Sequence, residues 1–273
     1  MSVRKGAPAL LSAGTLCAAL LLTGCANTAP PAPPAGSAAA APPGGDSRPE
    51  GPPAGTAGEA GGPAEAANSL TATRLPAPRL PGVGPVTQAL VPDGTTQALV
   101  VTGATADSST STATLYARDP GGRWTPKAGP WPAHNALQGW TSDHTAGDLR
   151  TPIGVFRIGD AGGRLPDPGA RLPYDQDEEF AISGTGFSGE PLEGSFDHVI
   201  AIDYNRVPGR TPLDKERPLG ADKGGGVWIH VDHGGPTQAC VALEREVLRA
   251  LLRALDPAAE PVVVMGPAPE LAR

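Results

Sequence analysis

A single cysteine close to two histidines is the part of this sequence best suited to covalent chemistry. Cys240 follows His230 and His233 within one short segment that contains Gly-Gly-Pro-Thr. A thiol becomes a strong nucleophile as its thiolate, and histidine is the base that most often accepts its proton. The pattern predicts a catalytic pair in which Cys240 attacks and His230 is its base. His233 is a competing candidate for the same role.

Cys240 is expected to be the only free thiol of the mature protein. A basic start is followed by an apolar run at 7–22, which contains Cys17, and Cys25 closes the sequence Leu-Thr-Gly-Cys. This run is too short for a permanent membrane span and is typical of a signal peptide. We predict a bacterial lipoprotein signal at 1–24, with lipid on Cys25 after cleavage; an ordinary secretory signal is the alternative. An unpaired cysteine in an exported protein indicates intermolecular pairing or a reactive thiol.

Composition divides the remaining chain into a linker and one domain. Residues 25–68 are rich in Ala, Pro and Gly and contain no aromatic residue, so we expect a lipidated N-terminus followed by a disordered spacer. Residues 69–273 are enough for one domain with a sizeable core. Without residues 1–24, which carry two basic residues and no acidic one, the net charge is (21 − 2) − 28 = −9. This charge argues against nucleic acid as a partner, and we expect a monomer in the cell envelope, outside the cytoplasm and anchored to the membrane through lipid.

The domain is predicted to be mainly β, a sandwich or barrel with one amphipathic helix after the cysteine. The expected strands are rich in β-branched or aromatic residues and lie at 97–102, 112–118, 153–158, 199–204, 227–231 and 262–265. Leucines and a valine recur on one face of 243–255, which predicts the helix. The segment 160–193 has little periodicity, and we expect loops over a binding face there.

The predicted elements would position the pair. Alternation along a strand puts His230 on the same side as Trp228, and a helix beginning just after Cys240 would favour the thiolate through its positive N-terminal end. The backbone N–H groups of Thr237, Gln238 and Ala239 could form an oxyanion hole together with that of Cys240, although a plain turn is equally compatible with the sequence.

Structural roles compete with each of these assignments. Free cysteines often serve as small buried apolar residues, and single histidines often make only a structural hydrogen bond. His144 and Asp148 are candidates for substrate contact, but a structural role in the loop that enters the next strand is favoured. One cysteine and two histidines form only part of a zinc ligand set, so no metal or cofactor is expected.

Two motifs together resemble the L,D-transpeptidase (YkuD-type) catalytic domain. The segment 151–156, Thr-Pro-Ile-Gly-Val-Phe, is similar to the family's Thr-Pro-x-Gly-x-Phe/Tyr signature, and a preceding Gly-Asp at 147–148 matches an extension seen in some members. The strand histidine, the segment 237–240 and the following helix resemble the second motif, and the likeness covers roughly residues 80–266. It implies that Cys240 attacks a peptidoglycan stem peptide at the bond between the L-centre of diaminopimelate and D-alanine, with His230 as base. A thioester would form and be resolved by an acceptor amine, and carbapenem-type β-lactams would acylate the same cysteine.

The sequence departs from this family at two positions before the nucleophile. Ala239 stands where glycine is usual, which would cost on the order of 1 kcal/mol if the backbone there needs a positive φ. Gln238 stands where histidine is frequent, and the interval from His230 to Cys240 is short compared with many members. These departures keep open a cell-wall-binding lipoprotein with a degenerate site, and hydrolysis by an L,D-carboxypeptidase is a further alternative. A papain-like enzyme needs a histidine after its cysteine, which this chain lacks, and a sortase would have threonine directly before it.

Overall fold

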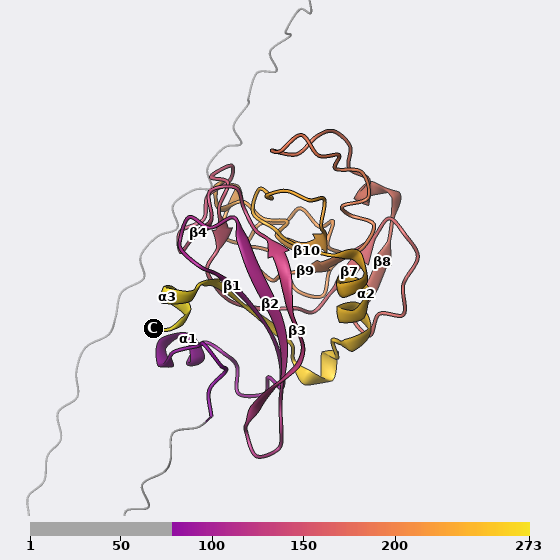
Figure 1. The fold of residues 1–273 in the computed structure, drawn as a ribbon. Helices are drawn as coiled ribbons and strands as arrows, with labels where there is room; N and C mark the ends of the chain where they lie inside the picture. Colours follow the sequence, from indigo (N-terminus) through magenta and orange to yellow (C-terminus); the bar gives the residue numbers. More distant parts are fainter. Residues whose placement is uncertain (1–77) are drawn as a thin grey trace, which may run out of the picture. The chain divides into compact units, whose positions relative to one another are not determined.

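The computed structural model describes residues 78–273, and Figure 1 shows their fold. The predicted signal peptide at 1–24, the predicted lipid site Cys25 and the predicted linker all lie outside the described residues. Within 78–273, no helix has both the length and the apolar character needed to cross a membrane.

The described part is mainly β, as predicted, and nearly all of its strands join one mixed sheet of ten. The order across this sheet is β6-β12-β1-β2-β3-β11-β10-β9-β7-β8, and β4 pairs with β5 separately. The strand bounds are β1 Gln97–Gly103, β2 Thr110–Arg118, β3 Trp124–His134, β4 Trp140–Thr141, β5 Thr151–Pro152, β6 Gly154–Arg157, β7 Ala161–Gly163, β8 Tyr174–Gln176, β9 Val199–Ala201, β10 Trp228–Val231, β11 Val241–Leu243 and β12 Val262–Pro267.

Strands β1 and β12 are covered on both faces of the sheet. Leu99 and Met265 belong to a large core cluster on one face, whereas Val100 and Val264 belong to a smaller cluster on the other. Side chains alternate between the two faces of a strand, so a strand buried on both faces needs an uninterrupted apolar run. The parallel pairing of β1 with β12 therefore explains why both sequences are continuous in Val, Leu and Met.

Three α-helices cover this sheet. Helix α2, Arg245–Ala254, packs Leu248, Leu251 and Leu252 into the large cluster, and the Glu244 side chain caps its start by accepting from two backbone N–H groups. Helices α1, Pro85–Gln88, and α3, Ala268–Leu271, lie side by side near the C-terminus (Figure 1), where Gly84 N–H donates to Leu271 O. Three short 3-10 helices complete the set at Glu178–Phe180, Ala221–Lys223 and Pro257–Ala259.

All six predicted strands are present with shifted ends, but the order around the cysteine was predicted wrongly. The helix was expected from Leu243, whereas Leu243 ends strand β11 and the helix begins at Arg245. Strand β11 pairs in parallel with β10 and antiparallel with β3, which buries Leu243 completely. A short apolar run beside a helical pattern has the same hydrophobic signal whether it forms a strand or part of the helix. Its structure is decided by pairing with other strands, which the sequence pattern does not show.

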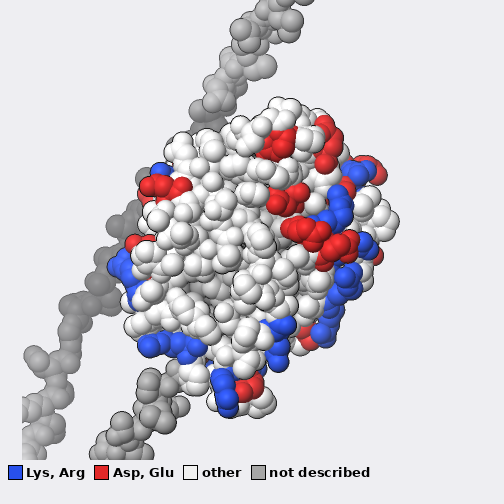
Figure 2. All heavy atoms as spheres, in the orientation of Figure 1, with Lys and Arg blue, Asp and Glu red and all other residues white. Residues whose placement is uncertain are grey.

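Charged side chains are sparse over the face formed by β2 and β3. Figure 2 shows uncharged residues across the middle and left of this view, with charged side chains along its margins and a mixed acidic and basic group to the upper right of the centre. Strand β3 contributes mostly Pro, Ala, Gly and Trp, with Lys127 as its only Lys or Arg. In this view the basic side chains are interrupted by acidic ones rather than forming a continuous basic surface.

Candidate active site

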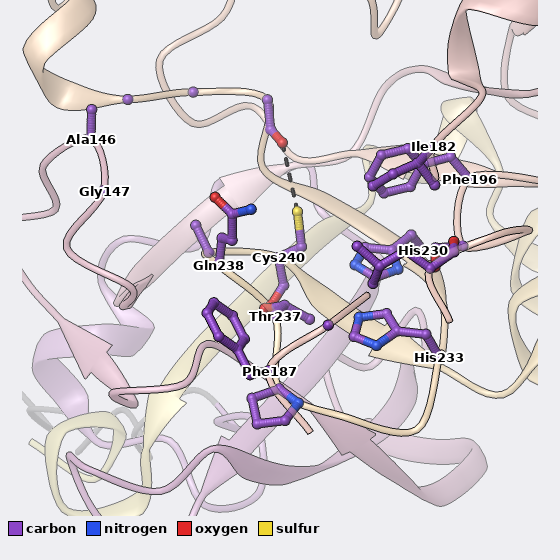
Figure 3. Close-up of a pocket in the computed structure, with 18 of the residues that line it drawn as sticks. Ala146, Gly147, Ile182, Phe187, Phe196, His230, His233, Thr237, Gln238 and Cys240 are labelled. Carbon is purple, nitrogen blue, oxygen red and sulfur yellow. Dashed lines mark hydrogen bonds between the residues drawn. The ribbon is translucent and has the colours of Figure 1, made fainter. Parts of the chain in front are cut away.

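Cys240, His230 and His233 line one cavity of about 520 Å³. Figure 3 shows the three side chains at this cavity, with Phe187 and Gln238 on its other sides. In the described part of the chain, the lining residues include three histidines but no Lys, Arg, Asp or Glu. A ligand in this cavity would therefore be bound mainly by apolar contacts, by backbone groups and by imidazole.

Strand pairing fixes the position of the Cys240 thiol. Because Ile229 pairs with Val241, the residue before β11 lies beside Trp228 at the start of β10. The Trp228 N–H donates to Sγ at 3.4 Å, and the thiol lies 3.6 Å from the Gly226 carbonyl, the contact drawn in Figure 3. The side chain is thus held by backbone on one side while the residue stays partly exposed.

The thiol is protonated in the resting protein. Burial raises the pKa of Cys240 to about 11, although the Trp228 N–H favours the thiolate. The prediction that a helix N-terminus stabilises the Cys240 thiolate is wrong, because β11 and Glu244 separate Cys240 from α2. The stabilising effect of a helix end falls off within its first turn. Activation of this thiol requires a base.

His230 has the tautomer that such a base needs. Its Nδ1 lies 2.9 Å from the Val231 carbonyl oxygen, and a carbonyl can only accept, so Nδ1 carries the hydrogen. Nε2 of the neutral ring is therefore free to accept a proton. Burial lowers the pKa of His230 to about 4, which keeps the ring neutral near pH 7. As predicted, Trp228 and His230 share one side of β10, since both contact Phe196, while Ile229 enters the core.

His233 stacks on His230 and is itself held by a carboxylate. The two rings are nearly parallel, with an interplanar angle of 10° and centroids 5.7 Å apart. His233 Nδ1 lies 3.0 Å from Glu190 Oε1. No sequence pattern connects Glu190 with the histidines, because Glu190 lies in a segment predicted only as loop.

The residues just before the thiol differ in what their backbone can offer. The Thr237 N–H donates to Asn135 O, so the proposed oxyanion donor at this position is already engaged. Among the described residues, the N–H groups of Gln238, Ala239 and Cys240 have no backbone acceptor. Within this part of the chain, positive φ outside glycine occurs only at Leu149, Asn205 and Glu260. Ala239 consequently does not carry the predicted backbone strain.

Thr151 of the Thr151–Pro152 strand contacts the backbone of Cys240, a contact that sequence reasoning missed. Thr151 is fully buried, and its hydroxyl accepts from Ala136 N–H at 2.9 Å and lies 3.5 Å from the Cys240 carbonyl oxygen. The Thr237 hydroxyl donates to the same carbonyl at 2.6 Å. Two threonines from distant segments therefore fix the backbone of Cys240. Phe156 packs at the edge of the large cluster against Tyr204.

His144 reaches the same cavity from the segment before this motif. Its Nδ1 lies 2.9 Å from Asp148 Oδ1, and its ring contacts Tyr204 edge-on. The structure brings His144 to the cavity wall, whereas Asp148 is not among the lining residues. In residues 78–273, no group of three or more His, Cys, Asp or Glu side chains is arranged to hold a metal ion.

A thiol and a neutral imidazole that line one cavity on a mainly β scaffold are the groups that cysteine-dependent acyl transfer needs. The family model of the L,D-transpeptidase catalytic domain (YkuD) matches residues 91–264, and the chain belongs to this family. Membership supports L,D-transpeptidase-type chemistry on peptidoglycan at the level of the family. No curated protein and no solved structure matches the chain.

Proposed function

We propose that this protein is a peptidoglycan L,D-transpeptidase that uses Cys240 as nucleophile and His230 as base. The observation that supports it most is the placement of both residues at one cavity in a chain that belongs to the L,D-transpeptidase family. The donor is a stem peptide with a diaminopimelate residue followed by D-alanine. The acceptor is an amine on a second stem peptide.

The proposed reaction has two acyl-transfer steps. Sγ of Cys240 attacks the carbonyl carbon at the L-centre of diaminopimelate while His230 Nε2 takes the thiol proton. The bond to D-alanine breaks, the leaving amine receives that proton, and a thioester remains on Cys240. The acceptor amine then attacks the thioester carbonyl and His230 removes a proton from that amine. The C–S bond breaks as the new amide bond forms, and the leaving thiolate takes the proton from His230, which restores the thiol.

The resting protonation states favour proton transfer during attack. With a neutral imidazole and a protonated thiol, a preformed ion pair would require the proton to move against a large pKa difference. A bound substrate excludes water and brings a polar carbonyl close to the thiol. The equilibrium for proton transfer from Cys240 to His230 therefore changes only when the complex forms. This supports a thiol that is unreactive until a substrate fills the cavity.

Backbone donors are proposed to stabilise the negative charge on the attacked carbonyl oxygen. The N–H groups of Gln238, Ala239 and Cys240 have no backbone acceptor in the described part of the chain, so they are available to this oxygen. Thr237 contributes through its hydroxyl, which holds the Cys240 carbonyl, rather than through its amide.

Location is proposed from the sequence alone. A signal peptide at 1–24, lipid on Cys25 and a linker to residue 68 would anchor the domain to the membrane and let it reach stem peptides in the cell envelope. The domain is proposed to act as a monomer and without a cofactor.

The test is incubation of the purified full chain with a tetrapeptide stem and, separately, with a carbapenem, followed by intact-mass measurement beside Cys240→Ala. We expect a Cys240-dependent adduct and released D-alanine. A crosslinked dimer identifies a transpeptidase, whereas a tripeptide alone identifies an L,D-carboxypeptidase. No adduct and no D-alanine from the unmutated protein would overturn the enzymatic proposal in favour of a non-catalytic cell-wall-binding lipoprotein.

A further inference from the structure

The segment Gly184–Leu192, here called the Glu190 loop, forms one wall of the cavity yet has little to hold it there. It closes on itself through Leu192 N–H to Gly184 O at 3.0 Å and Gly186 N–H to Glu190 O at 2.8 Å. Most of its residues are exposed, and Phe187, which faces the cavity, is 46% exposed. Exposed loops with few buried contacts open at low free-energy cost.

One contact ties this loop to a segment distant in the sequence. Among the hydrogen bonds of the described residues, only the one between Glu190 Oε1 and His233 Nδ1, at 3.0 Å, joins the Glu190 loop to a residue far along the chain. Both side chains are nearly buried, with exposed fractions of 12% for Glu190 and 6% for His233. A charge-assisted hydrogen bond shielded from water is stronger than one at the surface.

The surrounding backbone is shaped to accept the Glu190 carboxylate. A Cβ atom at Gly186 or at Gly235 would overlap Oε1, so the carboxylate would have to shift if either glycine carried a side chain. The Ser188 N–H donates to the second oxygen at 2.8 Å. Backbone donors, including that of Glu190 itself, and His233 hold the pKa of this carboxyl below its usual range against the opposing effect of burial.

His233 also contacts His230, the proposed base. Its ring is parallel to that of His230, and a charge on it opposes protonation of His230, whereas Asp232 favours that protonation. The Asp232 carboxylate is turned to His134 at 2.9 Å and to Gly234 N–H. The groups that face His233 are therefore Glu190 on the loop and His230 on β10.

We propose that Glu190 and His233 are positioning residues that latch the Glu190 loop over the cavity and hold one face of His230. The latch couples closure of the cavity wall to the orientation of the base, without either residue reacting with substrate. This inference rests on the proposed function for its effect on catalysis, but the latch itself exists or fails independently of activity.

The first arm of the test measures the loop without any reaction. Hydrogen exchange by mass spectrometry on the full chain should show amide exchange in 184–192 about tenfold faster in Glu190→Ala and in His233→Gln. Glu190→Gln, which keeps an acceptor but loses the charge, should fall between Glu190→Ala and the unmutated chain. Two matched controls should leave this segment unchanged: Glu179→Gln, an exposed glutamate, and His134→Gln, from a histidine–carboxylate pair outside the cavity. Unchanged exchange in Glu190→Ala and His233→Gln, or equal increases in the controls, would overturn the latch.

The second arm measures positioning of the base. In His233→Gln the acidic limb of the acylation pH profile should move to higher pH, because a charge that disfavours protonation of His230 is gone. In Glu190→Ala acylation at pH 7 should slow by about tenfold or less, without loss of the Cys240 adduct. Faster exchange with an unmoved profile and unchanged acylation would overturn the coupling to His230. Absence of acylation in every variant, the unmutated chain included, would overturn the proposed function while the exchange arm still decides the latch.

Discussion

The two walls of the cavity are built in opposite ways. On one wall, Cys240 and His230 are fixed by β10 and β11 and by two buried threonine hydroxyls. On the other, the Glu190 loop is mostly exposed, and its one hydrogen bond to a residue far along the chain is made by the Glu190 carboxylate. The proposed nucleophile and base lie beside or on paired strands, whereas the residues that we propose to control access to them lie on the loop.

We infer from this difference that one wall holds the proposed reacting groups and the other controls the entry of substrate. Atoms that must meet within a few tenths of an ångström benefit from positions on paired strands, because the register leaves them little freedom. A wall that a bulky peptide must pass benefits from a loop that opens cheaply. Substitutions on the sheet wall should therefore change the reaction itself, and substitutions on the loop wall should change closure.

The largest expected effect is at the nucleophile. Cys240→Ser should lower the acylation rate by about 1000-fold or more, because a hydroxyl is far less nucleophilic than a thiol near neutral pH. Serine is similar in size, so the thermal unfolding midpoint should stay close to that of the unmutated protein. Stopped-flow acylation by a carbapenem and calorimetry measure the two quantities. A serine variant that acylates at the original rate would place the nucleophile elsewhere.

The second largest effect is expected at His230, the proposed base. His230→Ala should slow acylation by about 100-fold or more at pH 7, in the range of general-base contributions, and His233→Ala should slow it by about tenfold at most. In the unmutated protein, acylation should fall as the pH drops through about 4, where His230 becomes protonated and can no longer accept the thiol proton. The plateau above it should extend well into alkaline pH, because the thiol ionises near 11. Equal losses in the two histidine variants would show that the base has been assigned wrongly.

Part of the fold was predictable because two neighbouring strands, β1 and β12, are buried on both faces. Uninterrupted apolar runs at β1 and β12 predict strands whatever surrounds them. Strand β3 was missed because its three prolines and two alanines carry almost no strand signal. Its register shifts against β2 show how the sheet accommodates this sequence through irregular pairing, which depends on tertiary contacts.

The candidate site was likewise only partly predictable from the sequence. Residue types and order predicted that Cys240 and His230 belong together, since both lie in one short segment of the sequence. The sequence could not predict that Thr151 supports the Cys240 carbonyl, because the two lie 89 residues apart and meet only through the sheet. Glu190 carried no local signal either, as its partner His233 is 43 residues away.

A smaller effect is expected from the support of the nucleophile. Thr237→Val removes the hydroxyl that donates to Cys240 O at 2.6 Å and leaves Thr151 as the nearest remaining donor. Losing this buried hydrogen bond should cost about 1–3 kcal/mol of unfolding free energy and slow acylation by about tenfold. Urea unfolding and acylation kinetics measure both. Thr125→Val, from a β3 threonine outside the cavity whose 3.4 Å bond is weaker, is the matched control and should leave acylation unchanged.

The smallest effect is expected next to the thiol, where the family usually has glycine. Ala239 has no positive φ and packs its methyl group against the large core cluster, so the backbone here does not require glycine. Ala239→Gly should change acylation by less than about twofold and should destabilise the protein by about 0.4–1 kcal/mol, mainly because glycine has more freedom in the unfolded chain. Acylation kinetics and urea unfolding measure these two effects. A gain in acylation of tenfold or more would mean that the alanine restricts the reacting geometry, and the sheet wall would then be less well adapted to catalysis than its hydrogen bonds indicate.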